Sequence, residues 1–354
     1  MSLAFKIAAS PAHILHETLL NPPQHSTRNV SFACRANMLA ERAQMSLSNI
    51  RHDVYVKIPP WTSKPRVDLR MSLCQPRCRT LARRIFAENI KRYGDARRIY
   101  TDGSKTTDGV SAAMVNLEVD TRSGFHLPNY FSIFSAEAFA ILQAIKSSTD
   151  GETVILSDSM SVLNAIASRL PSRNPIVQEI CSVLDSDTSI SLMWVPGHLG
   201  IEGNEAADAE AGKALSLPLM DCGLPHRDAT CVFNGLIVDA WTEEWRSSDS
   251  FLSKWKTNCR RSSCMKPLPR SLAVRLTRLR LGRIRLTECY KFTSSPPPTC
   301  EFCEEQLTVD HILLSPCDHL EEQQRRFGIG PLNNSEYFEQ TMEYAKAIGV
   351  WHRL

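Results

Sequence analysis

The chain lacks the long apolar runs of a membrane protein. No stretch of its 354 residues approaches the roughly 18 consecutive apolar residues that a bilayer-spanning helix needs. The amino-terminal segment contains His13, His16 and Glu17, where a secretory signal needs an unbroken apolar core. We therefore expect an intracellular protein, in the cytoplasm or the nucleus, without a membrane partner.

The sequence also lacks a strong excess of charge of either sign. Its 41 Lys and Arg residues and 38 Asp and Glu residues give a formal net charge of +3. Such a balance does not identify a nucleic-acid-binding protein, so the placement of the charges carries more information. The 12 cysteines, in a chain without a secretory signal, are expected to be reduced thiols or metal ligands.

Four regions follow from the residue pattern. Residues 1–95 are expected to be a poorly defined leader or remnant, because they contain Pro-Pro breaks but no repeat and no catalytic motif. Residues 96–216 alternate strand and helix patterns, and residues 217–293 read as a basic helical connector. Residues 294–354 read as a Cys/His-rich module that ends in a helix.

Residues 96–216 predict a mixed α/β domain. Apolar segments bounded by turn residues are expected to form five strands: 97–105, 110–119, 124–131, 153–158 and 189–196. Segments with helical periodicity are expected between and after them: 135–148, 159–168, 174–186 and 204–215. This order predicts a mixed five-stranded sheet flanked by helices.

Acidic residues lie at the ends of these elements, where functional groups collect in α/β sheets. Asp102 and Asp158 end apolar strands, Glu137 lies in the first turn of a helix, and Asp208 lies in the first turns of the last helix. Carboxylates gathered at one edge would repel one another unless cations neutralise them. Oxygen ligands select Mg²⁺ or Mn²⁺, and two such ions about 4 Å apart suit phosphodiester hydrolysis. Taken singly, each acid has an alternative interpretation as a solvated surface residue or a helix cap.

Sequence segments around these acids resemble type-1 ribonuclease H. They are TDGSK at 101–105, SAEAFAILQAI at 135–145, LSDSMSVLNAI at 156–166 and WVPGHLGIEGNEAADAEA at 194–211. More narrowly, they are similar to the ribonuclease H domain at the carboxyl end of non-LTR retrotransposon reverse transcriptases. The resemblance implies a ribonuclease H-like fold, and hydrolysis of the RNA strand of RNA–DNA hybrids, in a protein derived from a retrotransposon polyprotein.

The resemblance also implies roles for individual residues. Two Mg²⁺ or Mn²⁺ ions would be held by the matching acids, Asp102, Glu137, Asp158 and Asp208. His198 matches the family histidine that is thought to assist proton transfer or product release.

Contacts with the hybrid are expected from a further set of residues. Gly103 and Ser104 would place backbone groups against ribose, where the 2′-hydroxyl distinguishes RNA from DNA. Asn204 matches a family position near the hybrid backbone, and its alternative interpretation is a helix N-cap. The short span of residues 169–174 leaves no room for the basic protrusion of some family members, so further grip must come from elsewhere.

The run LAVRLTRLRLGRIRLTE at 272–288 alternates aliphatic residues with arginine. Arg275, Arg278 and Arg285 fall near helical spacing and are expected to contact nucleic-acid phosphates. The alternative is an amphipathic helix that packs on a core and leaves a solvated basic face, and one helix can do both. A similar stretch precedes the cysteine motif in the polymerases that this chain resembles, although they often have a His where this chain has Arg283.

A compact set of candidate zinc ligands follows, Cys300, Cys303, His311 and Cys317. Sulfur and imidazole donors at this spacing suit tetrahedral Zn²⁺ in a closed structural site. The set resembles the Cys/His knuckle that follows the ribonuclease H domain in non-LTR elements. Because Pro316 lengthens the last spacing by one residue, His319 is the alternative fourth ligand. For the whole set, the alternative is a small apolar cluster with unligated thiols.

The sequence also lacks the Tyr/Phe-x-Asp-Asp segment of a polymerase palm, so polymerase activity is not expected. The main hypothesis is a ribonuclease that acts on RNA–DNA hybrids. The alternative is a nucleic-acid-binding remnant whose nuclease domain has decayed. No pattern in the sequence indicates an oligomeric state.

Overall fold

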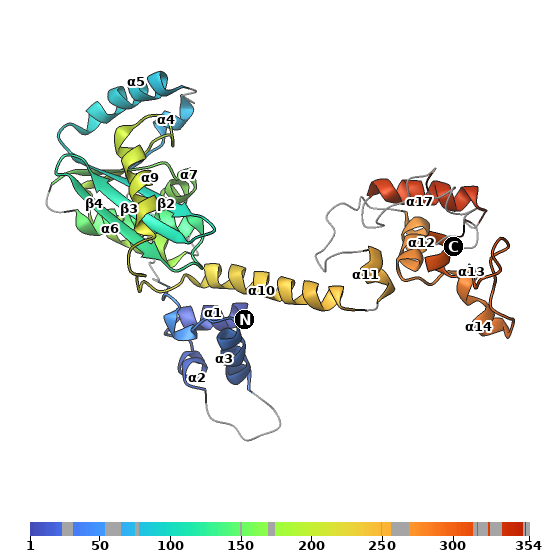
Figure 1. Cartoon of the computed structure of the whole chain (residues 1–354). Coiled ribbons are helices and arrows are strands. Elements are labelled where there is room, and N and C mark those ends of the chain that lie inside the picture. The colour runs from blue at the N-terminus through green and yellow to red at the C-terminus, as the bar shows by residue number, and fades with distance from the viewer. Residues whose placement is uncertain are drawn as a thin grey trace. The chain divides into compact units, whose positions relative to one another are not determined.

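A computed structural model of the protein shows two compact units, Met1–Asn234 and Gly235–Leu354 (Figure 1). The structure describes residues 1–22, 31–53, 65–74, 78–148, 151–168, 174–248, 250–255, 269–313, 317, 325, 335–349 and 351. The strand–helix region shares the first unit with the segment that precedes it, and the Cys/His-rich region lies in the second unit. The structure divides the chain at one point, between Asn234 and Gly235, and the four-region division that we expected stays a prediction.

A mixed sheet forms the centre of the first unit. Its strands are β1 (Val67–Asp68), β2 (Arg97–Lys105), β3 (Val110–Asn116), β4 (Thr121–Leu127), β5 (Thr153–Ser157) and β6 (Ile190–Trp194). They lie in the order β1-β6-β5-β2-β3-β4. The pairs β2–β3 and β3–β4 are antiparallel, whereas β2–β5, β5–β6 and β1–β6 are parallel.

The expected mixed α/β fold is confirmed, and the five expected strands are present. The expected strand number was wrong, because the sheet has six strands. The additional strand, β1, contributes two residues from the region that we expected to be a leader. A strand of this length is too short to show the alternation of apolar and polar residues by which strands are recognised.

The register of the parallel strands determines which residues meet at the edge of the sheet. Thr101 of β2 pairs with Ser157 of β5, and Ser157 pairs with Trp194 of β6. The residues that follow these three positions are Asp102, Asp158 and Val195. Asp102, within β2, therefore lies beside Asp158, which directly follows β5, and this register brings together two acids that are distant in sequence.

Helices cover both faces of the sheet. One face packs against the helices α6 (Ile133–Ser147), α7 (Met160–Ala167) and α8 (Pro175–Ser186). The other face packs against α5 (Arg79–Ile90) and α9 (Glu202–Ala214). The side chains of Ser132 and Asn174 cap the first turns of α6 and α8, accepting hydrogen bonds from the backbone N–H groups of Ser135 and Ile176.

The amino-terminal region is a packed part of the first unit and not a loose leader. Its helical elements are α1 (Ser2–Ala9), α2 (His16–Leu20), α3 (Phe32–Arg42), η1 (Leu47–Asn49), α4 (Arg70–Leu73) and η2 (Lys91–Tyr93). Phe5 and Leu19 are fully buried in the same apolar cluster as the residues of α6. The ring of Phe5 makes an edge-on contact, 6.0 Å between centroids, with Phe233 of α10 (His226–Arg246).

The second unit is built from short helices around a small core. They are α11 (Phe251–Trp255), α12 (Arg270–Arg280), α13 (Arg285–Glu288), α14 (Tyr290–Thr293), α15 (Val309–Leu313) and α17 (Ser335–Ala347). Leu276 and Leu279 of α12 are buried with Ile312 of α15 and Tyr344 of α17. The basic stretch and the Cys/His region thus share one core, which confirms the packing role of this amphipathic helix. Among the described residues, no helix is both long and apolar enough to span a bilayer.

Candidate active site and candidate metal centre

Three acids converge where β5 ends beside the middle of β2. Asp102 lies in β2, Asp158 directly follows β5, and Glu137 lies on α6. We expected Glu137 in the first turn of its helix. Because α6 begins at Ile133, Glu137 instead occupies the second turn. The ligand oxygens of the three carboxylates all lie within 4.8 Å of one another.

Gly103 allows α6 to approach β2 closely enough to bring Glu137 beside Asp102. A Cβ atom at Gly103 would lie 2.6 Å from the backbone nitrogen of Glu137 and 3.0 Å from the carbonyl carbon of Ala136. Real Cβ atoms do not come so close, so a side chain here would push the helix away from the strand. The proximity of the two acids therefore depends on a glycine at this position.

Burial and mutual repulsion shift the protonation of the three acids. Burial, followed by the charges of Asp158 and Asp208, raises the pKa of Asp102 to about 8. Burial, followed by the charges of Asp102 and Asp158, raises the pKa of Glu137 to about 9. Burial also raises the pKa of Asp158. The cluster therefore holds protons near neutral pH unless a cation replaces them.

Contacts from the last residue of β6 and from α9 hold Asp158 in place. The indole nitrogen of Trp194 donates a hydrogen bond of 3.0 Å to the backbone carbonyl of Asp158. The side-chain amide of Asn204 donates to Asp158 Oδ2 at 3.2 Å. A Cβ atom at Gly197 would lie 2.5 Å from the same carboxylate oxygen, so a glycine is needed there too.

The position of Asn204 rules out one of its two interpretations. Helix α9 has its N-cap at Ile201, so Asn204 lies inside the first turn and the N-cap interpretation was wrong. The residue is 1% exposed, and its amide faces Asp158. Its contacts support a role in orienting that acid, while a contact with the hybrid stays a prediction, as does the one proposed for the half-buried Ser104.

Asp208 and His198 lie beside the three-acid cluster. Asp208 is on α9, outside the group whose oxygens lie within 4.8 Å, but its charge raises the pKa of each of the three acids. His198 Nδ1 lies 3.6 Å from Asp208 Oδ2, and the side chain of His198 is 79% exposed. All five predicted catalytic residues therefore gather at one place, with the histidine on its solvent side.

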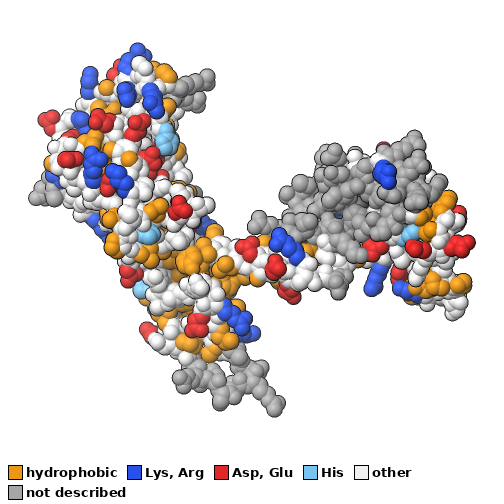
Figure 2. Space-filling model, in the orientation of Figure 1, with side chains coloured by type: hydrophobic (Ala, Val, Ile, Leu, Met, Phe, Trp, Pro, Cys, Tyr) orange, Lys and Arg blue, Asp and Glu red, His pale blue; other side chains and the backbone are white. Residues whose placement is uncertain are grey.

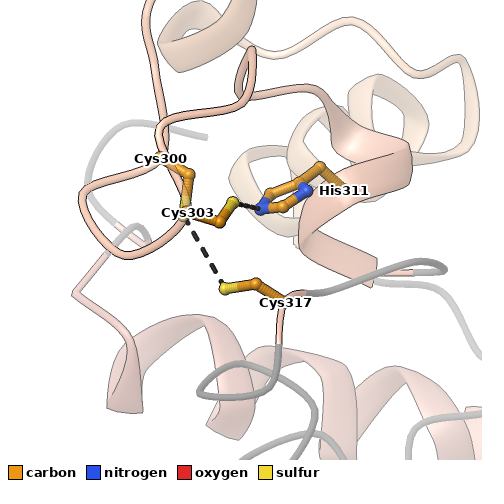
Figure 3. Close-up of side chains that lie close together, drawn as sticks. All are labelled: Cys300, Cys303, His311 and Cys317. Atoms are coloured by element: carbon orange, nitrogen blue, oxygen red, sulfur yellow. Dashed lines mark hydrogen bonds between the residues drawn. The ribbon is translucent and has the colours of Figure 1, made fainter.

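A second cluster, in the second unit, brings together Cys300, Cys303, His311 and Cys317 (Figure 3). The Sγ atoms of Cys300 and Cys317 are 3.9 Å apart, and Cys303 Sγ lies 3.6 Å from His311 Nε2. One ligand atom from each residue lies within 4.8 Å of all the others. The alternative ligand His319 lies outside the described residues, whereas Cys317 completes the set.

A tight turn presents the first two cysteines. The backbone N–H of Cys300 donates to Glu305, and that of Glu304 donates back to Cys300. Burial alone would raise the pKa of Cys300, but hydrogen bonds from Phe302, Cys303 and His311 outweigh it and lower the pKa to about 6. A thiol that readily becomes a thiolate is suited to metal binding.

Glu305 is a functional candidate that the sequence did not indicate. Its Oε2 lies 3.8 Å from His311 Nδ1, while Nε2 of the same ring faces Cys303. A carboxylate behind a metal-ligating imidazole fixes the ring orientation and the tautomer. Only the folded turn shows this pairing, because acidic residues are frequent near any such motif.

The predicted phosphate-binding arginines have different surroundings. The guanidinium of Arg275 lies 4.5 Å from the ring centroid of Trp351, so it stacks on an aromatic side chain of the same unit. Arg278 and Arg285 are exposed. Their contact with nucleic acid stays a prediction.

Comparison with known families identifies the central domain. Residues 95–216 match the family described as RNase H. The match runs from just before β2 to just after α9 and includes Asp102, Glu137, Asp158, His198 and Asp208. The first unit therefore contains an RNase H domain with a ribonuclease H-like α/β fold, a kind of domain that acts on RNA–DNA hybrids.

Proposed function

We propose that this protein is a metal-dependent endoribonuclease that cleaves the RNA strand of RNA–DNA hybrids. The observation that carries the proposal is the convergence of Asp102, Glu137 and Asp158, whose ligand oxygens lie within 4.8 Å of one another in an RNase H domain. Buried acids with raised pKa values at one site are frequent where a protein binds cations or performs catalysis.

The donor set fits hard divalent cations. It offers carboxylate oxygens alone, which favour Mg²⁺ or Mn²⁺ over softer metals. Glu137 Oε2 is buried and has no hydrogen-bond partner among the described residues, and coordination to a bound cation would satisfy this oxygen. We propose that two ions are held by Asp102, Glu137, Asp158 and Asp208. Bound there, they would activate water and stabilise the leaving oxygen.

The surrounding residues support this chemistry by orientation and proton transfer. Asn204 donates a hydrogen bond to Asp158 Oδ2 and so orients this carboxylate, while Gly197 leaves room for the same oxygen. His198 lies at the exposed side, next to Asp208. We propose that His198 exchanges a proton with the leaving group or assists the departure of the product.

We further propose that Cys300, Cys303, His311 and Cys317 hold a structural Zn²⁺ ion. Four protein ligands leave no open position, which is typical of structural and not of catalytic zinc. Glu305 would orient His311 within this site. Metal analysis of the purified chain tests this assignment, and we expect one zinc ion per chain.

An RNase H domain followed by a basic helix and a Cys/His cluster supports descent from a non-LTR retrotransposon polyprotein. RNA–DNA hybrids arise in both the cytoplasm and the nucleus, and we propose an intracellular location on that basis.

The experiment that tests the function is cleavage of an end-labelled RNA–DNA hybrid by the purified chain. Magnesium, manganese and chelator are compared, and duplex RNA and duplex DNA serve as controls. We expect metal-dependent cleavage of the RNA strand of the hybrid alone. Binding of the hybrid without cleavage under any metal would instead identify a decayed nucleic-acid-binding remnant.

A further inference from the structure

The loop that carries His198 is held by a helix from outside the matched domain. Arg83, on α5, donates a hydrogen bond from Nε to the backbone carbonyl of Gly200 at 2.7 Å. The backbone N–H of Gly200 in turn donates to Glu205 Oε1 at 2.8 Å. Both backbone polar groups of this buried glycine are therefore held by side chains, one from α5 and one from α9.

The backbone of this loop depends on such support. His198 has a φ of 55° and Gly200 a φ of 80°, so both adopt the left-handed conformation. A residue other than glycine keeps that conformation only where its surroundings determine it. Because His198 lies two residues from Gly200, the contacts that fix Gly200 also limit where the imidazole can lie.

Arg83 packs closely against the loop. A Cβ atom at Gly200 would lie 2.9 Å from Arg83 Nε, so the guanidinium rests directly on the glycine backbone. Helix α5 is itself anchored to the first unit, since Ala82 and Ile90 are buried and Phe86 packs against the apolar cluster that includes residues of the sheet. Figure 2 shows basic side chains over this helix, and Arg83 and its neighbour Arg84 are both exposed.

We propose that Arg83 is a positioning residue for His198. By holding the carbonyl of Gly200, it fixes the turn between Gly197 and Gly200 and keeps the imidazole beside Asp208. Residue 83 precedes the matched span of 95–216, so this inference extends the working active site into the amino-terminal region. It rests on the proposed function, of which a role for His198 in cleavage is a part.

A matched pair of variants separates the hydrogen bond from the charge. Arg83→Gln removes the charge but keeps a donor nitrogen at the same number of bonds from the backbone as Nε. Arg83→Met removes the charge and the donor but keeps the length of the stem. Arg84→Met is the control for the loss of one positive charge from the same helix.

Cleavage of a labelled hybrid at saturating metal gives kcat and KM for each variant. We expect Arg83→Met to lower kcat about tenfold, because a small displacement of a catalytic group is costly. Arg83→Gln is expected to keep kcat within about threefold of the parent, and Arg84→Met to leave it unchanged. In a His198→Ala background, Arg83→Met should have no further effect, since the two residues act as one unit.

Amide exchange of the loop provides a measurement that does not depend on cleavage. We expect faster exchange in a peptide that covers residues 195–203 in Arg83→Met than in Arg83→Gln, with unchanged melting temperature. If the parent chain does not cleave hybrids, the proposed function fails, while this comparison still decides whether Arg83 holds the loop. Equal exchange in the two variants overturns the inference. An equal rise in KM at constant kcat in Arg83→Met and Arg83→Gln would also overturn it, because loss of the charge alone would then explain the effect and Arg83 would be a phosphate contact.

Discussion

The two candidate metal centres of this chain differ in their donors and in how they are assembled. The oxygen donors of the first come from β2, α6 and the end of β5, elements spread over residues 102–158, and the register of the sheet brings them together. The sulfur and nitrogen donors of the second lie between residues 300 and 317 and are gathered by a turn and the short helix α15. In the first unit the fold brings the ligands together, whereas in the second unit we expect metal binding to stabilise the fold.

This difference predicts how each unit behaves without metal. The first unit has a large apolar core, and its fold can tolerate buried acids at the cost of keeping them protonated. Among its described residues, the second unit has a core of eight buried apolar side chains, most of them on short helices. For small domains of this kind, metal binding and folding are commonly one event.

Removal of the proposed zinc ion is expected to have the largest effect. Structural zinc binds zinc-finger peptides with apparent free energies of about 10–16 kcal/mol, more than a small core can replace. We expect Cys303→Ser to unfold the second unit, including α12, because Leu276 and Leu279 share the core with Ile312. Protease cleavage within residues 270–313, with residues 97–214 still resistant, measures this outcome.

The exposed Cys289, which lies outside the ligand cluster, provides the matched control. Cys289→Ser should retain both zinc and protease resistance. An unchanged second unit in Cys303→Ser would mean that the four residues form a thiol cluster and that the core alone maintains the fold.

Loss of one acid is expected to have the next largest effect, and on catalysis alone. Asp102→Asn keeps the shape of the side chain but replaces one oxygen of this metal-binding carboxylate with an amide nitrogen. We expect the cleavage rate to fall by about 10³-fold or more, because catalytic groups that act as a unit lose most of their effect when one of them is removed. Binding of the hybrid, measured by fluorescence anisotropy, should stay close to that of the parent, as should the zinc content. Cleavage that survives the substitution would contradict the two-metal mechanism.

The contrast between the centres also explains what could be predicted from the sequence. The Cys/His set is local, so its spacing alone indicated the ligands, and the structure brings together the four that were predicted. The acids are distant in sequence, but each one lies in or directly after an element that the sequence pattern predicted. Strand order then places Asp102 and Asp158 at one edge.

Other features could not be predicted because no local pattern marks them. The strand β1 has two residues, and its pairing with β6 depends on tertiary contacts. The close approach of Gly103 to Glu137, and the hydrogen bond from Arg83 to Gly200, join residues that are far apart in the chain. The amino-terminal helices are likewise buried against the apolar cluster that includes α6, and no local sequence pattern shows that these segments meet.

The close approach of α6 to β2 at the first centre can be tested by substituting Gly103. In Gly103→Ala the new Cβ would lie 2.6 Å from the backbone nitrogen of Glu137, so α6 must move. We expect a loss of about 1–3 kcal/mol in the free energy of unfolding. We also expect weaker Mg²⁺ binding, because Glu137 moves away from Asp102. Urea denaturation and metal titration measure the two effects.

Gly212, in the interior of α9, is the matched control, because a Cβ atom there meets nothing within 4 Å. Gly212→Ala should stabilise the chain by up to about 1 kcal/mol, since alanine is the better helix former. If both substitutions had the same small effect, a tight strand–helix contact would not be what brings the acids together.

Metal binding at the acids should depend on pH in a direction that follows from their raised pKa values. Burial raises the pKa of Asp102 to about 8 and that of Glu137 to about 9, so the folded, metal-free chain keeps protons that the unfolded chain releases. The unfolding free energy of the metal-free chain therefore falls as pH rises from the ordinary carboxylate range towards these values. Mg²⁺ must displace the same protons, so its affinity should rise over that range.

Calorimetric titration of Mg²⁺ at pH 6 and at pH 8 measures this dependence. Each displaced proton contributes up to about tenfold in affinity per pH unit, or about 1.4 kcal/mol. Buffers with different ionisation enthalpies should report proton release on binding, and Asp102→Asn should release fewer protons than the parent. Equal affinity at both pH values would mean that the acids are ionised before the metal arrives. The first centre would then be preformed in charge as well as in shape, which would sharpen its contrast with the second centre, where metal binding and folding are expected to be one event.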